Sequence, residues 1–424
     1  MTHTPAFPTV SMIGLGYIGL PTAAMFAARR VRVIGVDINQ NAVDTINRGE
    51  IHIVEPELDM IVHSAVSEGY LRATTRPEPA DAFLIAVPTP FKGEHEPDVS
   101  YVQAAAESIA PVLRAGNLVV LESTSPVGTT EQLVQWLAAA RPDLRFPGAS
   151  GAVDAVDVHV AYCPERVLPG HVVRELVEND RIIGGLTPAC SERAVALYRT
   201  FVQGELLVTN ARTAEMCKLT ENSFRDVNIA FANELSLICD RIGIDVWELI
   251  RLANHHPRVN ILQPGAGVGG HCIAVDPWFI VDRTPEQARL IRTAREVNDG
   301  KPQWVAGRIR AAVRECATGA RRARVAVLGL AFKPNIDDLR ESPALHIAES
   351  LHQAGDIECL FVEPNVTALP ASLAGGRLVS LDEALAQADV VAVLVAHREF
   401  ADLADRLRPG QAAVDAVGVL RPQA

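Results

Sequence analysis

A single cysteine follows a run of glycines near residue 270. The run Pro264-Gly-Ala-Gly-Val-Gly-Gly270 leads into His271 and Cys272, and its glycines let backbone come close to a ligand. A thiolate held there could attack an aldehyde carbon and later act as a leaving group. Two other roles stay open: a small buried hydrophobe, which is the commoner role of a lone cysteine, and a metal ligand beside His271. No second ligand pair at a suitable spacing accompanies it, so we expect no metal.

Polar side chains that could assist such a thiol lie on a helical stretch before it. Lys218 and Asn222 are four residues apart and share one helix face, and Arg225 lies three residues further on. A lysine can transfer protons or stabilise negative charge, and an amide can donate to a developing oxyanion. The same spacing also fits a solvated polar stripe. Glu165, in the string Cys-Pro-Glu-Arg, follows a predicted strand and could be a base or a buried capping acid.

The glycine pattern near the start of the chain predicts a dinucleotide site. Gly14-Leu-Gly16-Tyr-Ile-Gly19 follows a predicted strand and opens a helix, whose N-terminus would present partial positive charge to phosphates. Asp37 ends the next strand, where a carboxylate can accept both ribose hydroxyls and would repel a 2′-phosphate. We therefore expect NAD rather than NADP. The alternative is a glycine-rich turn in an α/β protein that binds another ligand.

Two later loops follow strands of the same predicted sheet. They contain Thr89, and Thr124 with Thr130. Hydroxyls and exposed backbone at that edge suit contacts with ribose and phosphate, although plain turn chemistry explains either loop alone.

The last segment repeats the opening pattern without its full glycine signature. Residues 325–331 resemble residues 10–16, and the strand that comes after each ends in an acid, Asp37 or Glu363. Because GxGxxG is absent, we do not expect a second dinucleotide here in the usual way. Lys333 and Arg340 instead indicate that anions approach from this side.

Apolar periodicity defines the elements that must position these residues. Strands are predicted at 10–13, 31–36, 82–87, 118–122 and 159–161, with helix-length stretches between them. This alternation is typical of βαβ units around a parallel sheet. A helix without Gly or Pro runs from Ala211 to about Arg241, and further helices are predicted at 246–253 and about 286–297. A second alternating unit has strands at 325–328, 359–362 and 390–395 and a helix at 343–353. We therefore predict an α/β fold with two Rossmann-like, doubly wound lobes joined by a long central helix.

Composition excludes several classes of protein. The 424 residues contain 39 Lys and Arg against 51 Asp and Glu, a net charge of -12, which argues against nucleic-acid or anionic-membrane partners. Seven cysteines without a CxxC pair are typical of reduced thiols. The start lacks a signal-peptide pattern and no run of 18 apolar residues occurs, so we expect a cytoplasmic protein.

Together these residues resemble the nucleotide-sugar 6-dehydrogenases, the family of UDP-glucose, GDP-mannose and UDP-N-acetylhexosamine dehydrogenases. The resemblance covers nearly the whole chain in order. It rests on Gly-Leu-Gly-Tyr-Ile-Gly-Leu-Pro, Cys-Pro-Glu-Arg, Glu-Met-Cys-Lys-Leu-Thr-Glu-Asn, Gly-Gly-His-Cys and Ala-Phe-Lys-Pro-Asn-Ile-Asp-Asp. One departure is Ala266, which stands where the family's loop usually has the second proline of Pro-Gly-Pro-Gly.

The resemblance implies a four-electron oxidation in which a sugar C6 alcohol becomes a carboxylate and two NAD+ are reduced. It implies UDP-N-acetyl-D-mannosamine as the substrate, with UDP-N-acetylglucosamine and UDP-glucose as alternatives. It also implies an NAD-binding domain over 1–210, a central dimerisation and catalytic-loop region over 211–317, and a UDP-sugar-binding domain over 318–424.

The resemblance further implies a role for each site residue. Cys272 would hold the aldehyde as a thiohemiacetal and then a thioester, while Lys218, Asn222 and a water held by Asp276 assist and Glu165 promotes hydrolysis. Cofactor contacts would come from the three glycines and from Tyr17, Ile18, Asp37, Thr89, Thr124, Thr130 and Arg340. Substrate contacts would come from Arg166, Val167, Lys218, Asn222, Arg225, His256, Arg258, Gly269, Phe332 and Lys333. A homodimer through the central helices would bring Arg258 to the neighbouring active site.

Two other functions remain open on the sequence alone. One is a two-electron hydroxyacid dehydrogenase with a catalytic lysine, which would release one NADH per substrate and tolerate Cys272→Ser. The other is an NAD-binding regulator without catalysis, which the presence of Cys272, Lys218, Asn222 and Asp276 disfavours.

Overall fold

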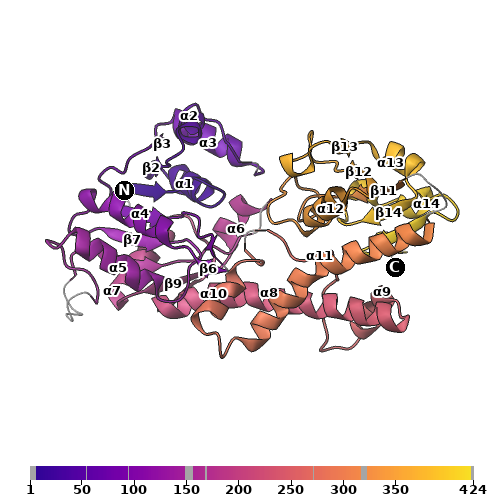
Figure 1. Cartoon of the computed structure of the whole chain (residues 1–424). Coiled ribbons are helices and arrows are strands. Elements are labelled where there is room, and N and C mark those ends of the chain that lie inside the picture. Colours follow the sequence, from indigo (N-terminus) through magenta and orange to yellow (C-terminus); the bar gives the residue numbers. More distant parts are fainter. Residues whose placement is uncertain are drawn as a thin grey trace. The chain divides into compact units, whose positions relative to one another are not determined.

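The computed structural model describes residues 6–53, 55–93, 95–148, 156–167, 170–270, 272–316 and 322–421. The chain forms two compact units, Met1–Glu221 and Asn222–Ala424 (Figure 1). The boundary between them falls inside α8 (Ala211–Ile242), a helix of 32 residues. This is the long central helix that the periodicity of residues 211–241 predicts.

The first unit is built on an eight-stranded sheet in the order β10-β9-β8-β7-β4-β1-β2-β3. Its strands are β1 (Thr9–Ile13), β2 (Arg32–Val36), β3 (Leu71–Thr74), β4 (Ala82–Ile85), β7 (Leu118–Leu121), β8 (His159–Tyr162), β9 (Arg181–Gly185) and β10 (Leu206–Asn210). Its other elements are the hairpin of β5 (Phe91–Lys92) and β6 (Glu96–Pro97), α1 (Gly19–Ala28), α2 (Gln40–Asn47), α3 (Leu58–Ser67), α4 (Ser100–Ile109), α5 (Thr129–Ala140), α6 (Val172–Glu178) and α7 (Pro188–Tyr198).

The five predicted strands of this unit are present and pair parallel with one another, and one further strand departs from this pattern. β9 runs antiparallel to β8, and β10 then pairs parallel with β9. Sequence reasoning missed β9 because it ends in Gly184-Gly185, and glycine is depleted in strands. In the structure a Cβ on Gly184 would lie 2.5 Å from the Cβ of Ala214, so the glycine allows α8 to pack close to the sheet.

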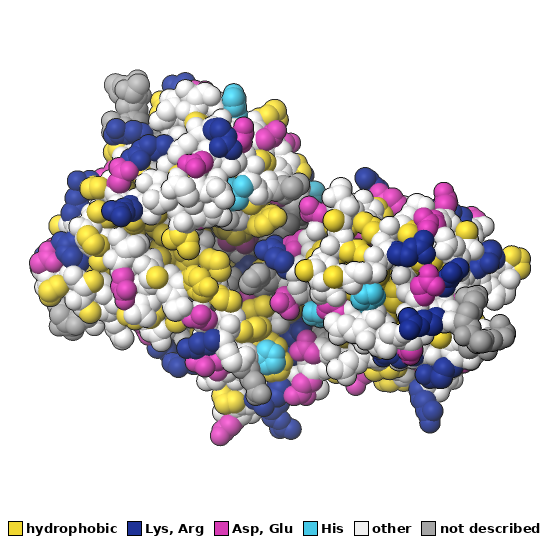
Figure 2. Space-filling model, turned by 45° about the horizontal axis from the view of Figure 1, so that its top comes forward, with side chains coloured by type: hydrophobic (Ala, Val, Ile, Leu, Met, Phe, Trp, Pro, Cys, Tyr) yellow, Lys and Arg dark blue, Asp and Glu magenta, His cyan; other side chains and the backbone are white. Residues whose placement is uncertain are grey.

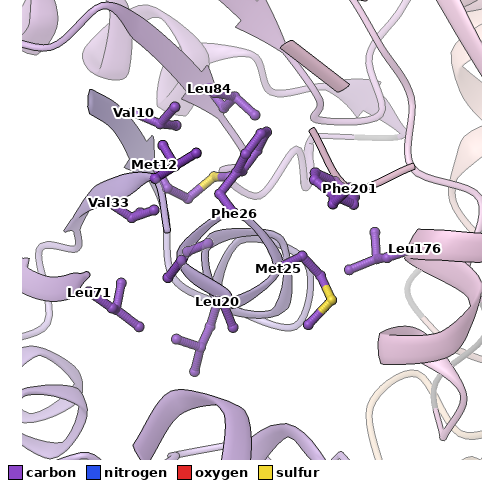
Figure 3. Packing of buried hydrophobic residues seen from close by; sticks show 14 of the residues in the cluster. Val10, Met12, Leu20, Met25, Phe26, Val33, Leu71, Leu84, Leu176 and Phe201 are labelled. Atoms are coloured by element: carbon purple, nitrogen blue, oxygen red, sulfur yellow. The ribbon is translucent and has the colours of Figure 1, made fainter. Parts of the chain in front are cut away.

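The core of the first unit explains how the glycine turn is held in place. Helix α1 packs against β1 and β2, with Leu20 and Phe26 fully buried (Figure 3). The ring of Phe26 meets that of Phe201 edge to face, with centroids 4.8 Å apart. Burying such a ring contributes about 1.5–3 kcal/mol, which fixes the start of α1 relative to the strand that precedes it.

The second unit contains a five-stranded parallel sheet in the order β13-β12-β11-β14-β15. Its strands are β11 (Ala323–Leu328), β12 (Ile357–Val362), β13 (Arg377–Leu378), β14 (Val390–Val393) and β15 (Ala412–Asp415). Its helices, besides the second part of α8, are α9 (Val246–Ala253), α10 (Asp276–Arg283), α11 (Arg289–Cys316), α12 (Pro343–Ala354), α13 (Leu381–Gln387) and α14 (Leu403–Arg406), with 3-10 turns at 371–373 and 398–400.

Both faces of this sheet are covered, as a doubly wound fold requires. Val325 and Val327 of β11 belong to one apolar cluster, and the alternating Ala326 and Leu328 belong to another on the opposite face. The predicted helix at 286–297 is too short. α11 continues through Pro302 to Cys316, so proline does not end the helix here although it removes one backbone hydrogen bond.

The surface of the described residues carries mixed charge. On the face in Figure 2, Lys and Arg side chains are interspersed with Asp and Glu. No helix among the described ranges has both the length and the apolar character needed to cross a bilayer.

Candidate active site

The glycine turn after β1 has the geometry that the sequence pattern requires. Gly14 adopts a φ of +92°, and its N–H donates to the carbonyl of Val36 at 2.8 Å. A Cβ on Gly19 would lie 1.8 Å from the carbonyl oxygen of Gly14, so only glycine fits at the first position of α1. A Cβ on Gly16, in contrast, would meet nothing within 4 Å. Fold packing therefore explains Gly14 and Gly19, whereas Gly16 faces open space next to a helix N-terminus.

Asp37 is the acid that closes this turn. One oxygen of its carboxylate, Oδ2, accepts the N–H of Leu15 at 2.9 Å, and Oδ1 accepts the N–H of Asn39 at 2.9 Å. The carboxylate is only partly buried, and Tyr17 beside the turn is 38% exposed. The open space at Gly16, the start of α1 and an accessible carboxylate together fit a dinucleotide, with the phosphates at the turn and the ribose at Asp37.

The three predicted threonines differ in how their hydroxyls are used. Thr89 donates to the carbonyl of Thr124 at 2.6 Å, which joins the two loops at this edge of the sheet. Thr130 is fully buried, and both its N–H and its hydroxyl donate to Oε1 of Glu215, at 2.8 and 2.6 Å. The described contacts of Thr130 therefore anchor α5 to α8, and its contact with the cofactor stays a prediction.

Two predicted catalytic residues, Glu165 and Lys218, lie in the first unit. Burial raises the pKa of Glu165 to about 7, even though the charges of Lys218 and Arg181 lower it. One carboxylate oxygen of Glu165 also accepts the N–H of Val167. Lys218 is buried on α8, so the solvated stripe that its spacing also allowed is not what forms. With a pKa of about 7, the carboxyl of Glu165 is able to exchange protons near neutral pH.

Arg166, which is next to Glu165 in the chain, is held by the backbone and by α8. Its Nη2 lies 2.8 Å from Oε1 of Glu221, and its Nη1 donates to the carbonyl of Asp180 at 3.1 Å. The guanidinium is partly exposed, so it remains able to meet an anionic substrate.

Three further predicted catalytic residues, Cys272, Asn222 and Asp276, lie in the second unit. Cys272 is exposed, and its carbonyl accepts the N–H groups of Val275 and Asp276 at 3.0 and 2.8 Å. Asn222, buried on α8, donates from Nδ2 to Oδ2 of Asp276 at 2.5 Å. The turn after the thiol is therefore attached to the central helix through one side-chain hydrogen bond.

Cys272 differs from the other six cysteines, all of which the structure describes. Those six are buried or partly buried, and burial raises the pKa of Cys163 above the usual range and that of Cys359 to about 12. A buried thiol cannot reach a substrate, and of the seven cysteines only Cys272 combines exposure with a glycine-rich approach.

The glycines before Cys272 are required by close packing within the second unit. A Cβ on Gly269 would lie 2.4 Å from the carbonyl oxygen of Glu341 and 2.9 Å from the Cβ of Phe332. Gly270, at a φ of +81°, lies against the ring of Phe332. The structure therefore brings together two of the predicted substrate residues, Gly269 and Phe332. Ala266 is buried in the apolar cluster of this unit.

The remaining predicted contacts are surface residues. Arg225, His256 and Arg258 are exposed, and the N–H of Arg258 donates to Nδ1 of His256 at 3.3 Å. Lys333 is partly exposed, and Arg340 forms an ion pair with Asp338, at 2.6 Å from Nη2. Nothing in these contacts tests whether the residues bind substrate or cofactor, so these roles stay predictions. His271 lies outside the described residues, and no cluster of three or more His, Cys, Asp or Glu side chains suited to a metal occurs within the described ranges.

Sequence reasoning missed a set of buried polar residues around the site. They are Glu215, Asp226 and Asn233 on α8, and Arg295 and Asn298 on α11. A signal was available: Asp226 and Asn233 continue the face of Lys218 and Asn222 at helical spacing, where apolar residues would be expected in a core.

The Gly14 turn with Asp37, the two doubly wound sheets and the exposed thiol are the features of an NAD-dependent dehydrogenase of two Rossmann-like lobes. Family models confirm this class over most of the chain. Residues 8–202 match the NAD binding domain of the UDP-glucose/GDP-mannose dehydrogenase family, residues 212–300 its central domain and residues 326–422 its UDP binding domain. The chain belongs to the UDP-glucose/GDP-mannose dehydrogenase family.

Individual members of the family are similar to this chain over almost its whole length. The chain is 66% identical over 421 residues to UDP-N-acetyl-D-mannosamine dehydrogenase of Escherichia coli, covering 98% of this chain and all of the relative. It is also 66% identical over 403 residues to NDP-N-acetyl-D-galactosaminuronic acid dehydrogenase of Ralstonia nicotianae, covering 95% and 94%. A solved UDP-D-ManNAc dehydrogenase from Pyrococcus horikoshii shares 39% identity and a TM-score of 0.87, covering 98% and 96%. The UDP-N-acetyl-mannosamine dehydrogenase of Staphylococcus aureus shares 43% identity and a TM-score of 0.86 over the same fractions.

Proposed function

We propose that this protein oxidises the C6 alcohol of UDP-N-acetyl-D-mannosamine to the carboxylate, through a covalent intermediate on Cys272. The observation that carries the substrate is the 66% identity to the Escherichia coli enzyme over the whole of that relative. The exposed thiol behind a glycine-rich loop supports the covalent route. NAD+ bound at the Gly14 turn would supply the acceptor for each of the two hydrides.

In the first step the C6 alcohol becomes an aldehyde, losing a hydride and a proton. Lys218, buried on α8, would stabilise the alkoxide in its ammonium form or take the proton as the neutral amine. The thiolate of Cys272 then forms a bond to C6, which gives a thiohemiacetal and prevents loss of the reactive aldehyde.

In the second step C6 loses another hydride and the thiohemiacetal hydroxyl loses its proton, which gives a thioester. Asn222 and Asp276 are joined to each other beside Cys272, and an amide there is suited to donate to the C6 oxygen. Water then attacks the thioester, Glu165 accepts its proton, and the C–S bond breaks to release the carboxylate and the thiolate. A pKa of about 7 suits Glu165 to that proton transfer.

Steady-state stoichiometry tests this proposal. We expect two NADH per molecule of UDP-N-acetyl-D-mannosamine for the wild type and loss of uronate formation in Cys272→Ala. Cys316→Ala, a partly exposed cysteine at the end of α11, is the matched control and should keep full activity. One NADH per sugar with an active Cys272→Ser would contradict the proposal and favour the two-electron dehydrogenase. Cofactor binding without turnover of any UDP-sugar would favour the regulator.

A second substrate is suggested by the Ralstonia nicotianae relative, whose identity is equally high. A nucleotide-linked N-acetyl-D-galactosamine derivative therefore belongs in the substrate panel with UDP-N-acetylglucosamine and UDP-glucose. A higher kcat/KM for any of these than for UDP-N-acetyl-D-mannosamine would change the substrate and leave the chemistry unaltered.

We also propose that the protein works as a homodimer through α8, in the cytoplasm. Phe224, Phe231 and Ile238 lie seven residues apart on α8 and are 68%, 51% and 48% exposed, with Ile242 on the same face. A heptad-spaced apolar stripe on one helix is suited to pair with its own copy. Seven cysteines without a disulfide agree with a reducing compartment.

Subunit mixing tests the dimer together with the role of Arg258. Dimers that combine Cys272→Ala with Arg258→Ala subunits would each keep one intact site, if Arg258 acts in the neighbouring site. After unfolding and refolding a mixture, about a quarter of wild-type activity should return by random pairing. No recovery in a mixture shown to contain mixed dimers would place Arg258 at its own subunit's site, whereas full activity of Arg258→Ala alone would place it outside any site.

A further inference from the structure

Four buried polar side chains join α8 to α11 in the second unit. Asp226 and Asn233 lie on α8, and Arg295 and Asn298 lie on α11, each at most 1% exposed. Figure 1 labels both helices. Arg295 Nη1 donates to Oδ1 of Asp226 at 2.6 Å, and Nδ2 of Asn298 donates to the same oxygen at 2.8 Å. Nδ2 of Asn233 donates to Oδ1 of Asn298 at 2.8 Å. These four residues, the α8–α11 network, form one continuous hydrogen-bonded chain.

The network binds the loop that carries Cys272 at both ends, at Gly265 and at Ile273. Asn233 Oδ1 accepts the N–H of Gly265, at the start of the glycine run, at 2.9 Å. Arg295 Nη1 donates to the carbonyl of Ile273, directly after Cys272, at 3.5 Å. The two anchored positions therefore enclose the segment that carries the thiol.

This segment needs restraint from outside. The stretch 265–272 contains four glycines, and glycine leaves the backbone more conformational freedom than any other residue. Phe332 and Pro343 pack against its glycines, but apolar contacts do not select one peptide orientation. Hydrogen bonds from a buried network do select one peptide orientation, because each donor and acceptor has a direction. A buried hydrogen bond that is left unmade is costly.

An apolar core between the helices would provide stability without such bonds. Burial of a charged pair such as Asp226 and Arg295 is often no more stabilising than apolar packing, and burial does raise the pKa of Asp226. What the polar set adds is direction: it aims an acceptor at Gly265 and a donor at Ile273.

We propose that Asp226, Asn233, Arg295 and Asn298 are positioning residues, which fix Cys272 for the covalent steps by holding both ends of its loop. This inference rests on the proposed role of Cys272 as the nucleophile. A nucleophile displaced by about 1 Å loses roughly 100-fold in rate, so weakening either anchor is expected to lower kcat with little effect on cofactor binding.

Asn233→Ala tests the anchor at Gly265. We expect kcat to fall about 10- to 100-fold, KM for NAD+ to stay within twofold, and amide deuterium uptake in peptide 262–275 to become faster. Asn233→Asp keeps the acceptor for Gly265 and loses the donor to Asn298, so it should retain more kcat and slower exchange than the alanine variant.

Asn117→Ala is the matched control. Asn117 is equally buried, donates to the carbonyl of Ala80 at 2.9 Å and accepts the N–H of Arg114 at 2.8 Å, but it lies in the first unit. Its loss should leave exchange in peptide 262–275 unchanged. If Asn233→Ala does not fold, Asn298→Ala, which removes the acceptor of the Asn233 amide, takes its place with the same two readouts.

The outcomes separate this inference from the proposed function. A folded alanine variant with wild-type exchange in peptide 262–275 would overturn the network's role, whatever its activity. Faster exchange with unchanged kcat would show that the loop is held but that the hold does not position Cys272, and would also overturn it. If Cys272→Ala kept forming uronate, the proposed nucleophile would fail, while the exchange comparison would still decide whether the network holds the loop.

Discussion

The first strands of the two sheets end in the same backbone turn. Gly14 after β1 and Gly329 after β11 both have a φ of +92°, and each donates to the last carbonyl of the neighbouring strand at 2.8 Å. The leucine next to each glycine is fully buried. Its N–H donates to the acid at the end of the second strand, at 2.9 Å for Leu15 and 2.7 Å for Leu330.

The two turns differ in what happens to the acid. Asp37 is partly exposed, and the described hydrogen bonds of its carboxylate come from the backbone N–H groups of Leu15 and Asn39. Glu363 is buried and also accepts the N–H of Ala331 at 3.0 Å, and Nε2 of His397 lies 3.0 Å from the same oxygen. The first acid stays available to a ribose, whereas the second is enclosed by protein.

They differ again one residue further along. A Cβ on Gly16 would meet only open space, whereas the corresponding Ala331 has its Cβ and is fully buried. Helix α1 begins at Gly19, but α12 begins only at Pro343, and the loop between turn and helix packs on the glycines before Cys272. A strand, a turn and an acid are therefore not enough for a dinucleotide site. The residues after the turn decide whether it binds a cofactor or supports the catalytic loop.

The largest expected effect comes from filling the open position of the first turn. Gly16→Ala should fold like the wild type, because a Cβ there meets no protein atom within 4 Å, but it would occupy the space where the pyrophosphate approaches. Overfilling a rigid site costs about 1–3 kcal/mol, or about 5- to 150-fold in Kd for NAD+. Isothermal titration measures this. Ala331→Gly, the matched change in the second turn, should leave Kd unchanged, and an equal loss in both variants would break the distinction between the turns.

A second prediction concerns Glu165, whose pKa is raised, whereas the pKa of Glu363 is lowered. Burial raises the pKa of Glu165 to about 7, so this carboxyl is neutral below pH 7 and ionised above it. If it accepts the proton of the hydrolytic water, uronate release should fall about tenfold per pH unit below 7. Glu165→Gln should be slow and lack this limb, which rapid-quench measurements from pH 5.5 to 8.5 would show. A limb that persists in the variant would assign the titration to another group.

Much of the fold was predictable, because it depends on local patterns. The apolar runs of β1, β2, β7, β11 and β12, and the helical spacing across α8, are visible within a dozen residues. β9 was not, since Gly184 serves packing against α8, which the local pattern does not contain. Long-range side-chain pairs were beyond reach for the same reason: Asp226 and Arg295 are 69 residues apart, and spacing alone gives no means to match them.

The candidate site also divides into residues that a local pattern indicates and residues that depend on a partner far away in the sequence. The positive φ of Gly14, the close packing of Gly19 and the position of Asp37 at the turn follow from a local motif, and a glycine run points to Cys272. The roles of these residues in binding and catalysis stay predictions. Residue type and spacing assign no role to Glu215, which anchors Thr130, or to Asn233, which holds Gly265. Their importance appears only when the partner across the fold is known.

A third prediction compares the stability contributed by the two acids. Glu363→Gln would replace a charged acceptor that binds Leu330, Ala331 and His397, and losing buried charged hydrogen bonds costs about 1–3 kcal/mol. Asp37→Asn should cost less stability, because the acid is partly exposed, but should weaken NAD+ binding. Thermal unfolding of both variants measures the loss of stability, and titration with NAD+ measures the loss of affinity. Equal losses of stability with no change in NAD+ affinity would remove the functional difference between the acids.

The smallest effect concerns the pH range in which Glu363 stabilises the second unit. Burial by itself raises the pKa of Glu363, but hydrogen bonds from His397, Leu330 and Asn365 outweigh it and lower the pKa from 4.5 to about 2. A lowered pKa in the folded state means that the stabilisation is complete above about pH 4.5 and is lost as the pH falls towards 2. The difference in Tm between the wild type and Glu363→Gln should therefore be constant from pH 7 to 5 and shrink below pH 4.5. Asp37→Asn, measured in parallel, corrects for the general loss of stability in acid. A difference that stayed constant down to pH 3 would mean that the charge of Glu363 contributes nothing, and that shape alone encloses the second turn.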